Sequence, residues 1–356
     1  MLNERYNRMI ELCKKKSSRF FQIGLEEEFF MINVAMLSKW HVHAVDYAKE
    51  ARENEHITIK VVWDEKADRG KKWADELGVE FEPDLMKVLN DSAIDAVIVD
   101  TPTNLHKEVI ILCAQHKKHI FTEKVLALTV EDCHEIFDVV NKHQVKLMLS
   151  LPRLTSSYYL YAQQVLDKGL LGQLTSIRCR CAHNGAVPFD DHPHGWLPKH
   201  FFNKEECGGG ALIDLGAHPI YLTNRLAGEA KAVTARLQKT MGHEVDDNAV
   251  VLVEYVSGAL GTLETSFVSH GSPFQLELYG TEGCLLIEET KAYLNCKQLG
   301  EKRINVENMP APLPMPLEQW AEHILFDKTP SITVEDMERL TLINQLASAS
   351  NQQKGK

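Results

Sequence analysis

The chain lacks three features that would place it in broad classes of protein. None of its apolar runs approaches the roughly 20 residues that a membrane-spanning helix needs. Its eight cysteines include no CxxC pair, which favours reduced thiols in a cytoplasmic protein. Lys and Arg are outnumbered by Asp and Glu, 39 to 50, and the resulting net charge of −11 argues against nucleic acid or an anionic membrane as a general partner.

The length and composition suit two globular domains. The chain has 356 residues, of which 44% are hydrophobic and 25% charged. We expect an N-terminal extension over residues 1–30, a first domain over 31–151 and a second over 152–356. The extension has a basic patch without the apolar core of a signal peptide. It is either a genuine helix with a charged face or a misassigned start, because "EEEFF" before Met31 is how a bacterial ribosome-binding site looks when it is translated.

Residues 31–151 alternate between apolar runs and helical patterns. The runs predict six strands, at Ile32–Leu37, Ile57–Trp63, Val79–Phe81, Ile94–Val99, Ile120–Thr122 and Val145–Leu149. Gly78 is placed to cap the end of one intervening helix, and Thr129 with Asp132 to open another. Apolar strands separated by helices indicate a parallel sheet covered on both faces, so this α/β segment is typical of a doubly wound, Rossmann-type nucleotide-binding domain.

The pattern changes after Pro152. "LTSIRCRCAH" (174–183) alternates apolar and polar residues, and "AVVLVEYVSGALGTLETSFV" (249–268) turns at Ser257-Gly258. A further hairpin is predicted in "FQLELYGTEGCLLIEE" (274–289). Consecutive hairpins indicate an antiparallel sheet, so we expect an α+β domain with a large, open, mainly antiparallel sheet.

Polar residues follow three predicted strands at their carboxyl ends, where ligands bind in sheets of this kind. Asp64 follows the second strand, and an acid there can bind the adenosine ribose of a dinucleotide and repel a 2′-phosphate, which favours NAD over NADP. Thr101-Pro102 follows the fourth strand. Glu123-Lys124 follows the fifth, and an ammonium in a partly dry cleft can stabilise a developing alkoxide. A helix cap and a solvated surface charge are the alternative interpretations of Asp64 and Lys124.

"GGGALIDLGAH" (208–218) places Asp214 and His218 four residues apart. If the segment is helical, both side chains lie on one face. The histidine can then take a hydroxyl proton near neutral pH, and the carboxylate can fix its tautomer. A hydrogen-bonded core histidine is the alternative.

These segments, with Arg153 after the sixth strand, resemble the glucose–fructose oxidoreductase / inositol dehydrogenase (Gfo/Idh/MocA) family. Further matching segments are "DAVIVDTPTNLH" (95–106), "GLLGQLTSIR" (169–178), "GWLPKHFF" (195–202), "DDNAVVLVEY" (246–255) and "ELYGTEG" (277–283). The resemblance covers about residues 31–350. It implies an NAD(P)-dependent enzyme that moves hydride between nicotinamide and a hydroxyl or carbonyl carbon of a sugar, cyclitol or related polyol. It also implies a homodimer or homotetramer built through the open sheet, and no metal.

The resemblance assigns roles to single residues. Lys124 matches the lysine that contacts substrate and nicotinamide in the family. His218 matches the general acid/base, and Asp214 matches the acidic residue beside that histidine. Asp64 is matched with the acid that binds the adenosine ribose, and Arg153 with the substrate. The cofactor wall is matched by Thr101, Pro102, His106 and Glu123.

Two positions depart from the family pattern. Val125 replaces the proline after Glu-Lys, and Ser38-Lys39-Trp40 replaces the glycine-rich phosphate loop. A side chain there can block the diphosphate. However, phosphate binding depends mainly on helix N-terminal N–H groups, Lys39 can add a cation, and Trp40 can turn away onto the sheet. We therefore expect NAD still to bind, shifted or more weakly, at residues Ser38, Lys39, Trp40 and His41.

The loop 183–202 is rich in histidine. A zinc site with Asp190 or Asp191 is one interpretation, but the spacing matches no zinc motif. His183, Asn184 and Trp196 are better interpreted as polyol contacts, which combine hydrogen bonds with an aromatic surface.

Two alternative functions remain open on the same fold. One is a non-catalytic protein that senses NAD or a sugar, which the altered phosphate loop favours. The other is an NAD-assisted glycosidase, to which Lys124, Asp214 and His218 are equally suited.

Overall fold

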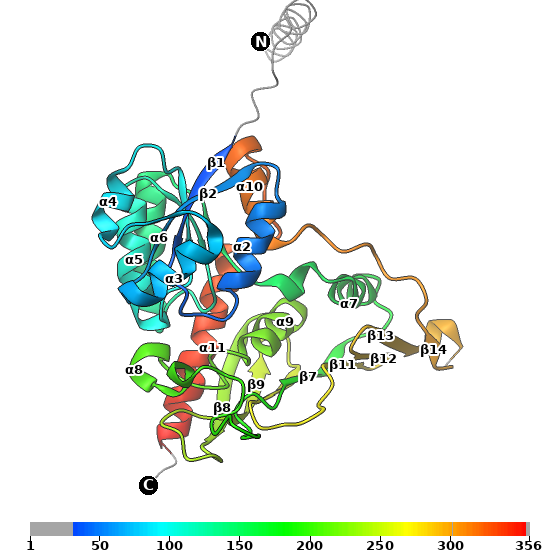
Figure 1. Cartoon of the computed structure of the whole chain (residues 1–356). Coiled ribbons are helices and arrows are strands. Elements are labelled where there is room, and N and C mark those ends of the chain that lie inside the picture. Colours follow the sequence, from blue (N-terminus) through cyan, green and yellow to red (C-terminus); the bar gives the residue numbers. More distant parts are fainter. Residues whose placement is uncertain (1–30, 301, 354–356) are drawn as a thin grey trace, which may run out of the picture. The chain divides into compact units, whose positions relative to one another are not determined.

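The structure is a computed structural model that describes residues 31–300 and 302–353. Both interpretations of residues 1–30 fall outside these residues. From Ile32 onward the chain groups as one compact unit, so the division expected at residue 151 stays a prediction. Each of the two sheets nevertheless comes from one side of that position (Figure 1).

The first sheet is parallel and has six strands. They are β1 (Ile32–Leu37), β2 (Ile57–Trp63), β3 (Glu80–Phe81), β4 (Ala96–Val99), β5 (His119–Thr122) and β6 (Leu147–Leu149). Their order, β3-β2-β1-β4-β5-β6, is that of the Rossmann fold. The predicted doubly wound sheet is thus confirmed. The order reverses between β1 and β4, and ligands bind beyond the carboxyl ends of the strands at such a switch point.

Helices connect these strands in the predicted alternation. They are α2 (Ala44–Glu53), α3 (Ala67–Leu77), α4 (Leu85–Asn90), η1 (Thr103–Leu105), α5 (His106–Gln115) and α6 (Val130–His143). Gly78 ends α3 with a left-handed φ of 64°, which costs glycine little. Thr129 Oγ1 accepts the Asp132 N–H at 3.1 Å and opens α6. Both predicted caps are confirmed.

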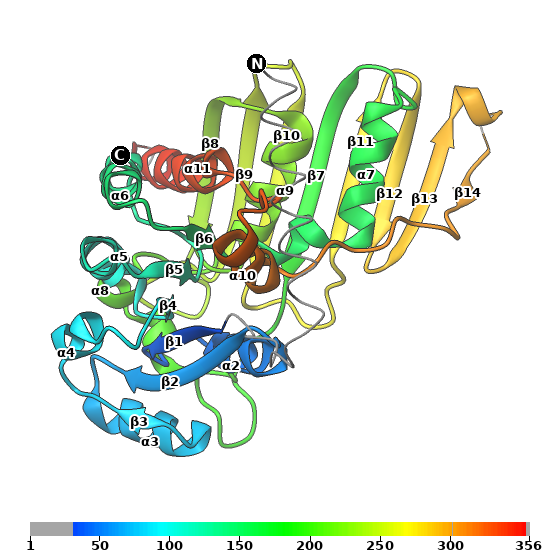
Figure 2. The same ribbon diagram turned by 90° about the horizontal axis from the view of Figure 1, so that it is seen from above.

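The second sheet has eight strands. They are β7 (Leu174–Ala182), β8 (Ala230–Gln238), β9 (Asn248–Tyr255), β10 (Leu260–Ser266), β11 (Gln275–Gly280), β12 (Gly283–Glu288), β13 (Lys291–Cys296) and β14 (Ile304–Asn305). Their order is β14-β13-β12-β11-β7-β10-β9-β8, and only the β7–β10 pair is parallel. The large, mainly antiparallel sheet is confirmed, and Figure 2 shows it spread beside the first sheet.

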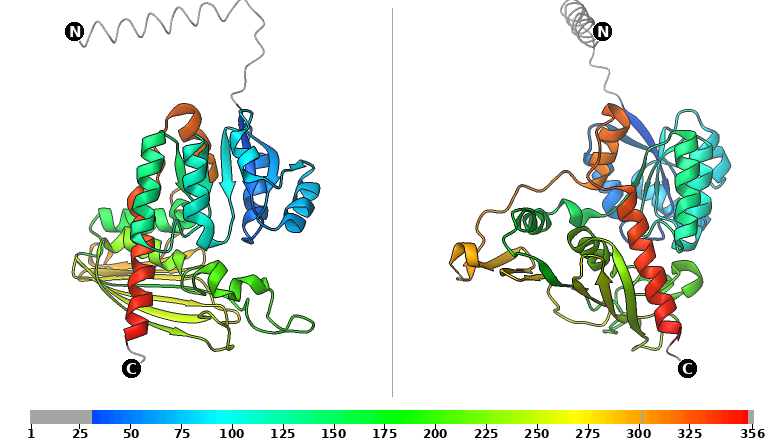
Figure 3. Two further views of the ribbon diagram at one scale, coloured as in Figure 1. Left: turned by 90° about the vertical axis from the view of Figure 1, so that its left-hand side faces the viewer. Right: turned by 180° about the vertical axis from the view of Figure 1, so that it is seen from behind.

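The remaining helices cover the second sheet and return to the first. They are η2 (Pro152–Thr155), α7 (Ser157–Asp167), η3 (Lys199–Phe202), α8 (Lys204–Cys207), α9 (Ala217–Ala227), η4 (Lys297–Leu299), α10 (Pro316–Phe326) and α11 (Val334–Gln353). α10 contacts α2, β5 and β6, whereas α11 contacts α6, α9 and β8 (Figure 3). Asp336 on α11 pairs with Arg225 on α9 at 2.5 Å. α11 thus links α6 of the first half to α9 and β8 of the second. No helix of the described part of the chain is long and apolar enough to cross a membrane.

Candidate active site

The β1–α2 loop, residues 38–43, turns most of its N–H groups into the protein. Ser38 is buried with a left-handed φ of 78°, in the place where this fold usually has glycine. The acceptors are Asp64 Oδ2 for the Lys39 N–H, Ser38 Oγ for Trp40, Asp100 O for His41, His41 Nδ1 for His43 and His41 O for Ala44. Most of the loop donors that could bind a diphosphate at this helix N-terminus are therefore already bonded.

Trp40 is covered by the second half of the chain. Its indole is 3% exposed and stacks on Phe201, with ring centroids 5.0 Å apart and an interplanar angle of 8°. Trp40 Nε1 donates to Glu206 Oε2 at 2.8 Å, and its carbonyl oxygen is bonded to His200 Nε2 at 2.8 Å. The expectation that Trp40 packs on the first sheet is wrong, because the aromatic side chains of η3 offer it a closer apolar surface.

The two charged residues predicted for the cofactor also have partners within the protein. Lys39 Nζ lies 2.5 Å from Glu76 Oε2 and above the Trp73 ring, so the expected phosphate contact is absent from this arrangement of the described residues. The fully buried Asp64 carboxylate receives Arg69 Nε and Nη2, each at 2.8 Å. The carboxylate predicted to bind the adenosine ribose thus binds the Arg69 guanidinium in this structure.

The predicted cofactor wall is buried. Pro102 precedes η1, and Thr101 Oγ1 has no hydrogen-bond partner among the described residues. His106 places Nδ1 2.8 Å from Val125 O and Nε2 3.1 Å from Thr101 O. Its ring therefore joins two backbone segments.

As arranged, this region does not fit a dinucleotide. The space between the β1–α2 loop and the second half is a cavity of about 10 Å³, at the lower limit of what one water molecule needs. For NAD to bind, the segment 199–207, which contains η3 and α8, has to leave Trp40, and Arg69 has to leave Asp64.

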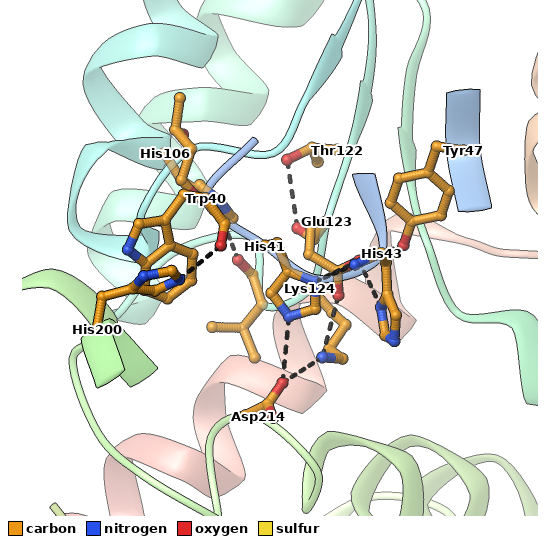
Figure 4. Close-up of polar contacts among 12 residues, drawn as sticks. Trp40, His41, His43, Tyr47, His106, Thr122, Glu123, Lys124, His200 and Asp214 are labelled. Carbon is orange, nitrogen blue, oxygen red and sulfur yellow. Dashed lines mark hydrogen bonds and ion pairs between the residues drawn. The ribbon is translucent and has the colours of Figure 1, made fainter. Parts of the chain in front are cut away.

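Lys124 forms the centre of a buried charged cluster (Figure 4). Its ammonium lies 2.6 Å from Asp214 Oδ1 and 3.1 Å from Glu123 Oε1, and its side chain is 2% exposed. Burial alone lowers the pKa of Lys124, but Asp214 and Glu123 outweigh it and raise the pKa above its ordinary value. The cluster joins the end of β5 to the segment before α9.

Asp214 lies in a turn, so the predicted helix through Asp214 and His218 is wrong at its start. α9 begins only at Ala217. The turn packs closely on the backbone of Asp246, where a Cβ on Gly210 would lie 1.9 Å from the Asp246 carbonyl oxygen. The Asp246 carboxylate accepts the N–H of Gly210 at 3.1 Å and of Leu212 at 2.8 Å.

The expected bond between Asp214 and His218 is also replaced. Asp214 Oδ1 lies 3.3 Å from His41 Nε2 besides its contact with Lys124, whereas His218 Nδ1 lies 2.7 Å from Tyr221 Oη. Burial lowers the pKa of His218 well below its usual value, and nearby Arg153 and Lys124 lower it further. The lowered pKa favours the neutral imidazole of His218, and a neutral imidazole can accept a proton.

The four predicted substrate residues have different surroundings. Arg153 donates to Tyr158 Oη at 3.2 Å, and its backbone N–H donates at 3.3 Å to Tyr221 Oη, which contacts His218. His183 stacks on Phe267 at 5.1 Å, and burial lowers its pKa. The 48% exposed Trp196 lies beside His183, with ring centroids 4.7 Å apart, and Asn184 is bonded to His270.

Sequence reasoning did not identify the groups that orient this site. Tyr47 donates to Glu123 Oε2, and Tyr221 contacts His218. A signal existed for both, because Tyr47 follows His43 by four residues and Tyr221 follows His218 by three, which are spacings of neighbours on a helix. Glu206, the partner of Trp40, had no such signal.

Comparisons with known proteins agree with the fold. Residues 37–151 match the oxidoreductase family with an NAD-binding Rossmann fold, and residues 159–286 match the GFO/IDH/MocA C-terminal domain. Levoglucosan dehydrogenase of Pseudarthrobacter phenanthrenivorans is 26% identical over 229 residues, only 57% of either chain. Myo-inositol 2-dehydrogenase of Thermotoga maritima is 25% identical over 263 residues, 71% of this chain and 75% of the relative. A solved levoglucosan dehydrogenase, in complex with NADH and levoglucosan, has the same fold, with a TM-score of 0.77 and 21% identity over 90% of this chain and 97% of that one.

Proposed function

The chain belongs to the Gfo/Idh/MocA family of oxidoreductases and carries its NAD-binding Rossmann domain, and we propose that it moves hydride between nicotinamide and a hydroxyl or carbonyl carbon of a sugar, cyclitol or related polyol. One observation carries the proposal. Lys124 at the end of β5 contacts Asp214, four residues before His218, and its charge contributes to the lowered pKa of His218. Relatives named for levoglucosan and myo-inositol support a ring with several hydroxyl groups as substrate.

The residues divide the chemistry in a simple way. An ammonium has three N–H donors. Lys124 directs two of them to the carboxylates of Glu123 and Asp214, which leaves one for a substrate oxygen. Neutral His218 takes the hydroxyl proton in oxidation and returns it in reduction. Asp214 positions Lys124 and keeps it charged. Arg153 and His183 contact the substrate near this point, with Asn184 and Trp196 at the surface.

Cofactor binding requires a change at the β1–α2 loop. Once the segment 199–207 withdraws, the N–H groups of that loop and the end of α2 become accessible to a diphosphate. We expect NAD rather than NADP, because Asp64, when released by Arg69, places a negative charge beside the ribose.

A non-catalytic sensor on the same fold is the second candidate. The observation in its favour is the bonded phosphate loop under Phe201, which makes the cofactor site costly to open. The two candidates differ in turnover, because a sensor binds NAD or a sugar without forming NADH.

Calorimetry with NAD and NADP, followed by a screen of cyclitols and anhydrosugars for NADH absorbance, tests the proposal. We expect turnover to fall about 10²–10⁴-fold in His218→Gln, the usual contribution of a positioned base. His134→Gln, at an exposed histidine of α6, should leave it unchanged. Binding without turnover would support the sensor, and full activity of His218→Gln would overturn the assigned role.

We also infer a homodimer or homotetramer that works in the cytoplasm. Strand alternation leaves Val250, Leu252, Leu260 and Tyr279 of the second sheet 37–59% exposed, and a second copy of the chain would cover them. The seven described cysteines are free thiols, which suits a reducing compartment. Light scattering on the purified chain and on Leu252→Glu tests the assembly, since a monomeric wild type would contradict it.

A further inference from the structure

Two histidines of the β1–α2 loop meet Glu123 at the end of β5. One ligand atom from each of His41, His43 and Glu123 lies within 4.8 Å of the others. His43 Nδ1 is 3.1 Å and His41 Nδ1 is 3.7 Å from Glu123 Oε2. Figure 4 shows the imidazoles beside the carboxylate. Nothing in the proposed hydride transfer requires two imidazoles here.

These separations are those of ligands around a small metal ion. With zinc bonds of about 2.0–2.1 Å to nitrogen and oxygen, two ligands of a tetrahedral site lie roughly 3.4 Å apart. The distances of 3.1 and 3.7 Å from Glu123 Oε2 bracket that value. The two imidazole nitrogens therefore already lie at about ligand distance from the carboxylate oxygen, and they are within 4.8 Å of each other. Metal binding would cost His41 Nδ1 the N–H of His43 that it now accepts at 3.2 Å.

The groups that usually orient metal ligands are also present. A metal-bound histidine commonly donates its other ring N–H to a carboxylate, and His41 Nε2 lies 3.3 Å from Asp214 Oδ1. The Glu123 carboxylate is in turn bonded by the Tyr47 hydroxyl. Ligands and partners thus come from three separate segments of the chain, at residues 41–47, 123 and 214.

Charge and access favour a cation. Glu123 and Asp214 are two carboxylates that share the ammonium of Lys124, so the cluster has one excess negative charge when its imidazoles are neutral. Glu123 is 1% exposed, whereas the His43 side chain is 35% exposed. His43 and Tyr47 also line a pocket of roughly 320 Å³ next to Ser150 and Pro152, which gives an ion a path inward and leaves room for water ligands.

We propose that His41, His43 and Glu123 bind one divalent transition-metal ion, with zinc as the ion that two imidazoles and one carboxylate suit best. Binding releases any proton that His43 Nδ1 shares with Glu123. The site goes beyond the proposed oxidoreductase function, because it requires neither nicotinamide nor polyol.

Zinc titration of the full chain tests the proposal. After treatment with a chelator, calorimetry with zinc chloride should give one ion per chain and a raised melting temperature. Tyr47→Phe, which removes only the partner of Glu123, should weaken zinc binding about 10–100-fold, and His43→Gln should weaken it at least as much. Cobalt(II) should give visible d–d bands in the wild type that His43→Gln loses.

His134→Gln is the matched control, because His134 is an exposed histidine of α6 that pairs with Glu338 of α11. It should retain zinc binding and the cobalt spectrum. The proposal is overturned if the wild type takes up no stoichiometric zinc, or if His43→Gln and His134→Gln bind it equally. Circular dichroism of each variant separates loss of the site from loss of the fold. A chain that binds zinc but forms no NADH would leave this site standing while the proposed function fails.

Discussion

Phe201 is the side chain whose removal should open the cofactor site. Its ring is 3% exposed and stacks on Trp40, directly over the loop that would hold a diphosphate. We predict that Phe201→Ala binds NAD more tightly than the wild type, which is unusual for a deletion in a buried cluster. The reason is that the Phe201–Trp40 contact exists only in the closed arrangement, in which segment 199–207 covers Trp40. This arrangement competes with the cofactor for the β1–α2 loop.

The magnitude follows from what the ring contributes to closure. Burial of a Phe side chain is worth about 1.5–3 kcal/mol, and its aromatic stacking about 0.5–1.5 kcal/mol more. Closure thus loses about 3 kcal/mol relative to the open form. Each 1.4 kcal/mol is tenfold in affinity, so NAD should bind roughly 100-fold more tightly if it binds only the open form. The bonds of Glu206 and His200 to Trp40 remain, so closure is weakened and not abolished.

Calorimetry with NAD on both proteins measures this effect, and Phe137 supplies the control. Phe137 is 9% exposed on α6, outside the segment 199–207. Phe137→Ala should lose stability, about 3–5 kcal/mol for a buried Phe, without a gain in NAD affinity. Equal affinities for the wild type and Phe201→Ala would refute the competition, as would an equal gain in both variants.

Three further predictions concern the chemistry and the stability of the fold. Because burial lowers the pKa of His218, its neutral form persists below pH 6.5, and kcat should decline only at lower pH; an acid limb at or above pH 6.5 in the pH–rate profile would contradict this. Asp336→Ala leaves the partly buried Arg225 without its carboxylate and should lower the free energy of unfolding, measured with urea, by about 3 kcal/mol. A loss of less than about 1 kcal/mol would contradict this prediction. Thr129→Ala removes the cap of α6 and should cost about 1 kcal/mol, measured in the same way, whereas no change would mean that the Asp132 N–H finds another acceptor.

The first sheet was predictable because its strands carry their own signal. β1 and β2 were placed with their observed bounds, since each is a predominantly apolar run between polar turns. β4 and β6 were each predicted two residues too long at their N-terminal ends, where Ile94 and Val145 are buried although they lie outside the strands. Apolar character reports burial, and it does not report where pairing begins.

The site was predictable only where it depends on strand ends. Lys124 and Glu123 were placed in the cleft because the topology brings every strand end to one edge. The cover over Trp40 was not predictable, because Phe201 is 161 residues away and no periodicity links them. The spacing of Asp214 from His218 is compatible with a helix, yet the turn before α9 is set by Asp246, which accepts N–H groups from 34 and 36 residues away.

The glycine-free loop shows how side chains can take the place of a ligand. In a glycine-rich loop the backbone N–H groups stay free and bind phosphate oxygens. Here Ser38 Oγ, Asp64 Oδ2 and His41 Nδ1 accept the N–H groups of the same segment, so the loop is satisfied without a diphosphate. Each such bond contributes about 0.5–1.5 kcal/mol net, and a cofactor must replace it to bind. Cofactor affinity in this chain therefore depends on the free-energy difference between the loop bonded to its own side chains and the loop bonded to a diphosphate. Substitutions that weaken the first of these states should change NAD affinity more than substitutions on the cofactor wall.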